Sequence, residues 1–260
     1  MGRLAESVDT LASIGVACGG GVHANGGAPP STPGRRDAPV ATALATRFGV
    51  PVTLESDVRA AAWGEYRFGG HRTRSLVTIF VGAGVGSGAV LDGVLWRGAG
   101  DAAGGLGHIQ VVLDGLPCPC GARGCLEQYA SAGGLQRRYR AARGTGVRSR
   151  LDQLTGGDPD ALPPAMVAAA ANSGDELARA LWLDTRRYLA LATATYVTLL
   201  DPEVLVFGGS LVEALPELID EVAGVVLAAT TPRVRESLRI ERARLGDWAA
   251  VLGAAALGAA

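Results

Sequence analysis

Three of the four cysteines of this chain lie within residues 118–125, and His108 precedes them. The segment GHIQVVLDGLPCPCGARGCLE therefore brings one imidazole and three thiols close together. Zn²⁺ favours four nitrogen or sulfur ligands in a tetrahedron, and Cys₃His is one of its closed structural sets. Gly121 and Gly124 permit tight turns between the thiols, and free thiols in a glycine-rich loop are the alternative. The pattern predicts a structural zinc ion bound by His108, Cys118, Cys120 and Cys125.

The composition narrows the class of protein. Of the 260 residues, 48% are hydrophobic and 19% are charged, which is typical of a folded domain and not of a disordered chain. The formal net charge of −1 argues against a nucleic-acid-binding face. The sequence has no apolar run of about 18 residues, so no transmembrane helix is expected. The charged N-terminal residues are unlike a signal peptide. We predict a cytoplasmic protein.

Strand-like and helix-like segments alternate along the chain. Strands are predicted over 13–17, 50–55, 200–211 and 238–245, together with a hairpin over 75–98. The Gly-, Pro- and Ser-rich segment 19–38 predicts a loop. Helices are predicted over 39–48, 57–69, 127–145, 160–200 (with a break at 173–174), 217–230 and 247–260. This alternation predicts a layered α/β fold.

The cysteine segment follows the pattern G-H-x9-C-x-C-G-x-x-G-C-x-E. Further segments agree with the same family in order: ESDVRAAAWGEYRFGG, VGAGVGSGAVLDGVLWRG, DPEVLVFGGSL and LGDWAAVLGAA. Together they resemble the ROK family, which covers bacterial glucokinases, N-acetylhexosamine kinases and sugar-responsive repressors. The segments AAAWGEY and CLEQYAS are most similar to actinobacterial glucokinases.

The resemblance implies an actin/hexokinase-like (ribonuclease H-like) α/β fold with two lobes and a ligand cleft between them. Residues 1–72 and 245–260 would belong to the small N-terminal lobe, and residues 73–244 would form the large lobe with the zinc site. Family kinases begin with a strand that carries D-x-G-G-T, a phosphate loop that is not found in this sequence. The segment SIGVA corresponds to a later strand of that lobe. We therefore expect a truncated N-terminal lobe.

The family reaction is phosphoryl transfer from ATP to a sugar hydroxyl, which needs a base and groups that hold the phosphates. The resemblance assigns the base to Asp57, whose alternative role is to cap the following helix. It assigns sugar contacts to Ser56, Asp57, His108 and Glu127. For Glu127 the alternative is an acid favoured by a helix dipole.

Two glycine-rich segments match the nucleotide side of the family. Backbone N–H groups in a glycine-rich hairpin can approach phosphate oxygens. Tight strand turns, or a plain strand-to-helix turn, are the alternative roles for these glycines. The resemblance implies ATP with Mg²⁺ as cofactors of an active enzyme, and nucleotide contacts at Gly82, Gly84, Gly86, Gly208 and Gly209.

The sequence departs from the family in its sugar site. Gly105 replaces a carboxylate that binds sugar hydroxyls, and Ser56 and Arg59 replace two asparagines. Ala83 replaces a hydroxyl of the phosphate hairpin, and the segment 28–34 lacks the expected Pro-Asn contact. Each lost hydrogen bond to a buried group costs about 1–3 kcal/mol. Several such losses together would be enough to abolish glucose binding or to retune the site to a different polyol.

Three functions are therefore compared. The first is an ATP-dependent sugar kinase that acts on glucose or a related sugar, amino sugar or cyclitol. The second is a catalytically degenerate ROK protein that acts as a sugar-binding regulator, although the sequence shows no helix-turn-helix. The third is a zinc-bound oligomerisation module. The resemblance implies a homodimer or homotetramer, with no membrane or nucleic-acid partner.

Overall fold

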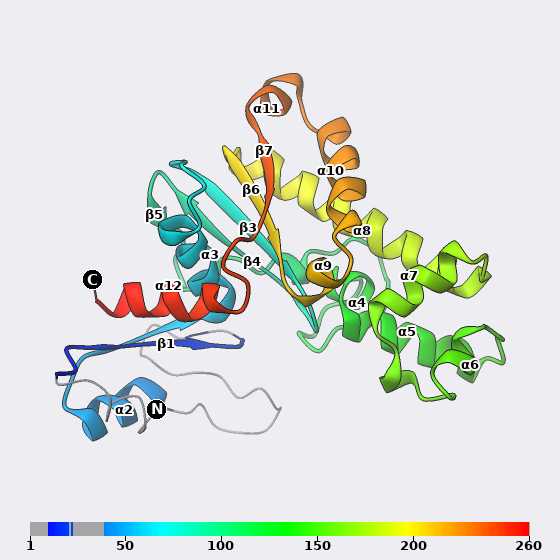
Figure 1. The fold of residues 1–260 in the computed structure, drawn as a ribbon, viewed down its shortest axis with the longest axis horizontal. Helices are drawn as coiled ribbons and strands as arrows, with labels where there is room; N and C mark the ends of the chain where they lie inside the picture. The colour runs from blue at the N-terminus through cyan, green and yellow to red at the C-terminus, as the bar shows by residue number, and fades with distance from the viewer. Residues whose placement is uncertain (1–9, 21, 23–38, 260) are drawn as a thin grey trace. The chain divides into compact units, whose positions relative to one another are not determined.

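The computed structural model describes residues 10–20, 22 and 39–259 (Figure 1). Most of the predicted loop 19–38, including 28–34, lies outside the described residues. The chain divides into two compact units. The first comprises residues 1–78, 88–104 and 243–260, and the second comprises 79–87 and 105–242. The lobe boundaries that the family resemblance implies stay a prediction.

The first unit is built around two parallel strands. Strand β1 (Ile14–Cys18) pairs with β2 (Val52–Ser56) in the register that sets Ile14 opposite Val52 and Cys18 opposite Ser56. Helix α2 (Val40–Phe48) precedes β2 and contacts it, and helix α3 (Asp57–Phe68) follows β2 directly. Helix α2 ends at Gly49, which has a φ of 68° and donates to the carbonyl of Ala45. Gly49 therefore caps the C-terminus of α2 in the left-handed conformation.

Helix α12 (Trp248–Gly258) packs against α3 and against both strands of this unit (Figure 1). The two helices approach so closely that their glycines face backbone. A Cβ atom at Gly253 would lie 1.7 Å from the carbonyl oxygen of Ala60, and one at Gly64 would lie 2.2 Å from that of Ala249. Backbone-to-backbone packing of this kind tolerates no added methyl group.

We predict that Gly253→Ala lowers the stability of the protein by about 1–3 kcal/mol, because the new methyl group must push α12 away from α3. Thermal unfolding measured by circular dichroism checks this. Gly224→Ala is the matched control, because Gly224 is also helical but a Cβ there meets nothing within 4 Å. That control should raise stability by about 0.5–1 kcal/mol through helix propensity. Equal effects of the two substitutions would contradict the close packing.

A buried carboxylate ties the chain to α3 just before it enters α12. Glu65 accepts hydrogen bonds from Nε2 of His71 (2.7 Å) and from the backbone N–H groups of Arg244 (3.0 Å) and Leu245 (2.9 Å). Burial by itself would raise the pKa of Glu65, but these hydrogen bonds from His71, Leu245 and Arg244 lower it below its usual value. Glu65 therefore stays ionised and holds the start of α12.

Five strands form one sheet in the order β5-β4-β3-β6-β7. They are β3 (Leu76–Val81), β4 (Val85–Leu91), β5 (Val94–Leu95), β6 (Val204–Gly208) and β7 (Arg239–Arg242). Strands β6 and β7 are parallel, whereas β4 and β5 form an antiparallel pair. All five residues of β6 are buried, which explains the continuous apolar run VLVF in the sequence. The predicted hairpin and the α/β class are confirmed.

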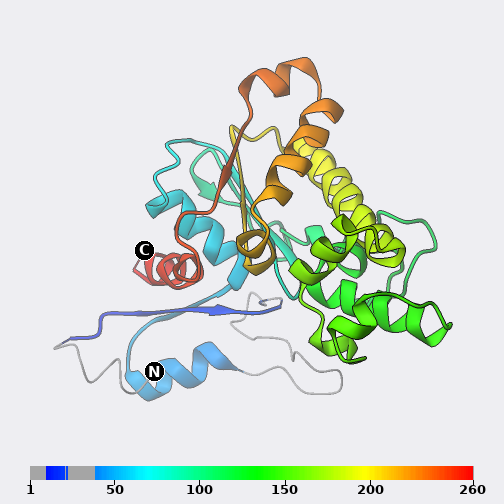
Figure 2. The same cartoon turned by 45° about the vertical axis from the view of Figure 1, so that its right-hand side comes forward.

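The second unit is largely helical (Figure 2). Its longest helix, α8 (Glu176–Leu200), contacts α4 (Glu127–Ala130), α5 (Ala132–Gly144), α7 (Pro164–Asn172) and α10 (Glu217–Ala229). The predicted break at 173–174 is confirmed, since Asp175 caps α8 by accepting from the N–H of Ala178. The shorter helices are η1 (Leu106–His108), α6 (Leu151–Leu154), η2 (Pro159–Ala161), α9 (Ser210–Ala214) and α11 (Pro232–Ser237).

Two predicted helices were wrong in detail. The segment 127–145 is not one helix, because Ser131 takes an extended conformation and caps α5 by accepting from the N–H of Gly134. The segment 160–200 does not begin as an α-helix, because prolines at 163 and 164 cannot donate the hydrogen bonds of a helix interior. Within the described residues, none of the helices combines the length and the apolar character needed to cross a membrane.

Candidate active site and metal centre

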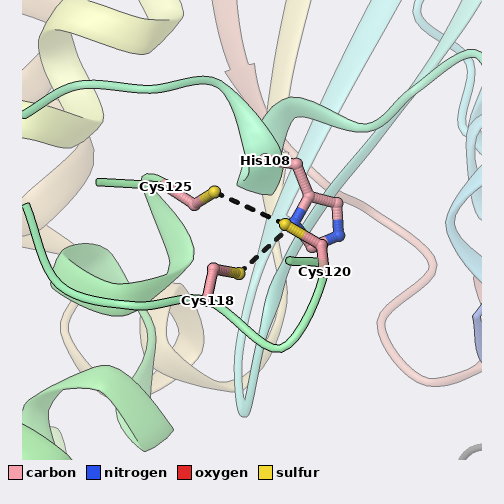
Figure 3. Close-up of side chains that lie close together, drawn as sticks. All are labelled: His108, Cys118, Cys120 and Cys125. Atoms are coloured by element: carbon pink, nitrogen blue, oxygen red, sulfur yellow. Dashed lines mark hydrogen bonds between the residues drawn. The ribbon is translucent and has the colours of Figure 1, made fainter. Parts of the chain in front are cut away.

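The four predicted metal ligands converge in the second unit (Figure 3). Their ligand atoms all lie within 4.8 Å of one another. Nδ1 of His108 is 3.8 Å from Sγ of Cys118, and Sγ of Cys120 is 3.7 Å from Sγ of Cys125. A tetrahedral ion with metal–sulfur bonds of about 2.3 Å sets its ligands about 3.8 Å apart. The spacing and the donor set therefore fit one four-coordinate metal ion.

The loop reaches this arrangement through two glycines in the left-handed region. Gly121 has a φ of 94° and Gly124 a φ of 74°. A Cβ atom at Gly124 would lie 1.7 Å from the carbonyl oxygen of Val112, so no other residue fits there without moving the chain. The N–H of Cys118 donates to the carbonyl of Ala122 at 2.9 Å, which closes the turn. The predicted role of both glycines is confirmed.

Side chains behind the cluster orient it. Nε2 of the buried Gln128 donates to Sγ of Cys118 at 3.4 Å, and Nε of Arg137 donates to Oε1 of the same glutamine at 3.1 Å. Partners of this kind fix the orientation of metal ligands. Gln128 was not predicted from the sequence, although its place beside Glu127 at the start of a helix is a signal for a residue that faces the same loop.

The protonation of the thiols depends on a cation. Burial, followed by hydrogen bonds and charge repulsion from Cys120 and Cys118, raises the pKa of Cys125 to about 12. Hydrogen bonds from the Ala122 backbone and from Cys118 lower the pKa of the exposed Cys120 instead. The thiol of Cys125 therefore stays protonated at neutral pH by itself. A bound divalent cation would favour its thiolate and release the proton.

The glycine-rich hairpin between β3 and β4 is held by the segment that follows the metal ligands. Oε2 of Glu127 accepts the N–H of Val85 at 3.0 Å. The first N–H groups of α5 donate to hairpin carbonyls, from Ala132 to Gly82 at 2.9 Å and from Gly133 to Ala83 at 3.3 Å. The carboxylate predicted to bind sugar thus also fixes the hairpin, within one unit.

Not every hairpin N–H is available to a ligand. The N–H of Gly82 donates to the carbonyl of Gly84 at 2.9 Å, so this group is already used. Among the residues that the structure describes, the N–H groups of Ala83 and Gly84 make no hydrogen bond. Gly86 lies in β4. The phosphate contacts assigned to these glycines stay a prediction.

The turn between β6 and α9 lies against the same hairpin. Gly209 has a φ of 93°, and a Cβ atom there would be 2.6 Å from the carbonyl oxygen of Val81. A Cβ atom at Gly82 would be 3.1 Å from Oγ of Ser210. The structure therefore brings Gly82 and Gly209 together, while Gly208 is the buried last residue of β6. Both predicted nucleotide-binding segments meet in the second unit.

Asp57 and Ser56 lie in the first unit, where β2 turns directly into α3. Asp57 is the first residue of α3, and Ser56 occupies the N-cap position without a side-chain cap bond. The alternative role of Asp57 as the N-cap is therefore wrong. Burial raises the pKa of Asp57, although the backbone N–H groups of Val58 and Asp57 itself act in the opposite direction. Oδ1 accepts from Val58 at 2.8 Å.

An ion-pair network beside this aspartate was not expected from the sequence. The buried Glu55 accepts from Nε of Arg59 and from Nε of Arg97, both at 2.7 Å. Nη1 of Arg59 donates to the backbone carbonyls of Asp101 (2.7 Å) and Ala103 (3.1 Å). In the sequence Arg59 is visible only as the replacement of an asparagine, because nothing nearby in the sequence points to Arg97 or to residues 101–103.

The chain is similar in sequence and in structure to known proteins. A glucokinase from Streptomyces coelicolor is 35% identical over 191 residues, which cover 72% of this chain and 60% of the relative. The matched part thus spans only about 60% of the length of that enzyme. Among solved structures, a ROK family glucokinase from Streptomyces griseus in complex with glucose and AMPPNP covers 98% of this chain and 83% of its own, with 32% identity and a TM-score of 0.79.

A regulator matches equally well in shape. A ROK family transcriptional regulator, a homologue of the E. coli MLC protein, covers 98% of this chain and 64% of its own, with 28% identity and a TM-score of 0.80. The predicted actin/hexokinase-like fold is confirmed by these structural neighbours. A model of the ROK family matches residues 2–260. With its Cys₃His cluster and its glycine hairpin, this chain belongs to the ROK family.

Proposed function

We propose that this protein is an ATP-dependent sugar kinase that transfers a phosphoryl group to a hydroxyl of glucose or a related sugar. The observation that carries the proposal is the environment of the Asp57 carboxylate. Its carboxylate is half-buried at the start of α3, makes no ion pair among the described residues, and has a pKa raised by burial. A carboxylate in that state is suited to accept a proton from a hydroxyl group.

The other predicted site residues have two roles, one toward the sugar and one toward the nucleotide. Ser56, His108 and Glu127 contact the sugar, with Nε2 of His108 available because Nδ1 faces the cysteines. The hairpin around Gly84 and the turn at Gly209 approach the nucleotide phosphates with backbone N–H groups. These side chains and N–H groups orient the two substrates so that the sugar hydroxyl, deprotonated by Asp57, attacks the terminal phosphorus.

The metal in the Cys₃His cluster is zinc in this proposal. All four ligands come from the protein, so the ion holds the loop that carries His108 and performs no chemistry on the substrate. Mg²⁺ would accompany ATP and neutralise phosphate charge when bound. The homodimer or homotetramer and the cytoplasmic location stay predictions.

A turnover assay tests the kinase proposal. ADP release from ATP and Mg²⁺ is measured with a panel of hexoses, amino sugars, sugar acids and cyclitols, and each sugar is also tested for binding by calorimetry. Turnover of any member supports a kinase. Binding without turnover would instead support the second candidate, a sugar-binding regulator, which the similarity to a transcriptional regulator favours.

The pH dependence of turnover follows from the raised pKa of Asp57. Catalysis needs the ionised carboxylate, so kcat/KM should fall as the pH drops through this raised value. The acid limb is expected clearly above the ordinary aspartate pKa of about 3.9. Initial rates between about pH 4 and pH 8 check this, with circular dichroism at each pH to exclude unfolding. A profile that stays flat down to the ordinary aspartate value would contradict a desolvated base.

A further inference from the structure

The Glu55–Arg59–Arg97 network has more positive than negative charge. The side chain of Glu55 is 3% exposed and that of Arg59 is 4% exposed, whereas that of Arg97 is 39% exposed. Two guanidinium groups thus share one buried carboxylate. An arginine stays protonated inside a protein, so the surplus charge cannot be removed by losing a proton.

Arg59 also determines where the following loop lies. Its Nε is fixed by Glu55, and its Nη1 is fixed by the carbonyls of Asp101 and Ala103. These carbonyls belong to the segment that runs into Gly105 and on to the metal ligand His108. The guanidinium therefore holds residues 101–103 against the helix that begins at Asp57.

One nitrogen of the Arg59 guanidinium has no protein partner among the described residues. Within the described part of the chain, Nη2 of Arg59 makes no hydrogen bond, and it is not among the nitrogens that are sealed from solvent. Asp57, two residues away, does not neutralise it. Among the described residues no hydrogen bond or ion pair joins the two side chains, because Oδ1 of Asp57 accepts from the N–H of Val58. A buried guanidinium with unused donors and surplus charge favours an anionic acceptor.

We propose that Arg59 is a specificity-determining residue whose Nη2 binds a carboxylate substituent of the substrate, so that the site takes an acidic sugar. The inference rests on the proposed function, since it concerns the site around Asp57. Nε and Nη1 of Arg59 are already used, and the two N–H groups of Nη2 are the donors that a carboxylate of the substrate would engage.

A matched pair of ligands tests this proposal. D-glucuronate and its neutral amide, D-glucuronamide, differ at the substituent that Arg59 would bind. For the parent protein we expect the acid to bind and to turn over at least about tenfold better than the amide, as is typical of a charged hydrogen bond. Arg59→Asn should remove this preference, and Arg59→Lys should retain part of it because the charge remains.

Arg74→Gln is the control, since Arg74 is an exposed arginine paired with Asp92. It should leave the ratio of acid to amide unchanged. The ratio is insensitive to a general loss of folded protein, and thermal unfolding is measured for each variant. No preference for the acid in the parent protein, or the same preference in Arg59→Asn, would overturn the proposal. Calorimetry separates the two proposals. Acid-selective binding that depends on Arg59 but occurs without turnover would support the carboxylate-binding role of Arg59 and contradict the proposed kinase activity.

Discussion

Replacing Asp57 by asparagine should lower turnover of every sugar that the protein phosphorylates by about 10²–10⁴-fold, the contribution typical of a general base. Asparagine keeps the shape of the side chain and cannot accept the hydroxyl proton. The effect should fall on kcat more than on sugar affinity, because the amide can still make hydrogen bonds. Coupled measurement of ADP release at saturating sugar gives kcat directly, and calorimetry gives the affinity.

The stability of the same variant is informative. The pKa of Asp57 is raised in the folded state, so the ionised form that prevails at neutral pH is disfavoured by folding. Asparagine removes that charge, and the protein should unfold at the same or a higher temperature. Asp220→Asn on the exposed face of α10 serves as the control and should leave turnover unchanged. Because Asp220 lies in the first turn of that helix, its loss should lower stability by about 0.3–1 kcal/mol. A variant that loses stability, or one that keeps full turnover, would contradict the assignment of the base.

Removing the metal from the Cys₃His cluster should cause the largest loss of stability. Structural zinc sites in small peptides contribute apparent free energies of about 10–16 kcal/mol, and here the binding energy is likewise folding energy. We expect chelation, or Cys125→Ser, to lower the free energy of unfolding by at least about 5 kcal/mol, which lowers the unfolding temperature by more than about 10 °C. Elemental analysis of the purified protein identifies and counts the metal.

Two comparisons make the metal experiment specific. Cys18→Ser removes the one cysteine outside the cluster and should leave both metal content and unfolding temperature almost unchanged. Adding zinc back to the chelated parent protein should restore the unfolding temperature, while the same addition to Cys125→Ser should not. A purified protein without bound metal and with an unaltered unfolding temperature after chelation would show that the thiols only pack against each other.

The sequence by itself determined what depends on short stretches of chain. The four metal ligands lie within one short segment, and the glycines at 121 and 124 are the residues that its turns require, so their convergence followed from local geometry. The position of Asp57 directly after a strand was likewise readable, as were the glycine hairpin and the order of strands and helices. In each case the constraint is carried by neighbours in sequence.

Only the tertiary structure decided which distant groups meet. Glu55 and Arg97 are 42 residues apart, and Glu65 and Leu245 are 180 apart. The N–H of Gly82 turned out to be used within its own hairpin, and Glu127 turned out to hold that hairpin. Hydrogen bonds and ion pairs of this kind depend on how whole elements pack, because burial removes water as the competing partner. Residue type alone does not specify such partners, so the surplus charge at Arg59 emerges only from the folded chain.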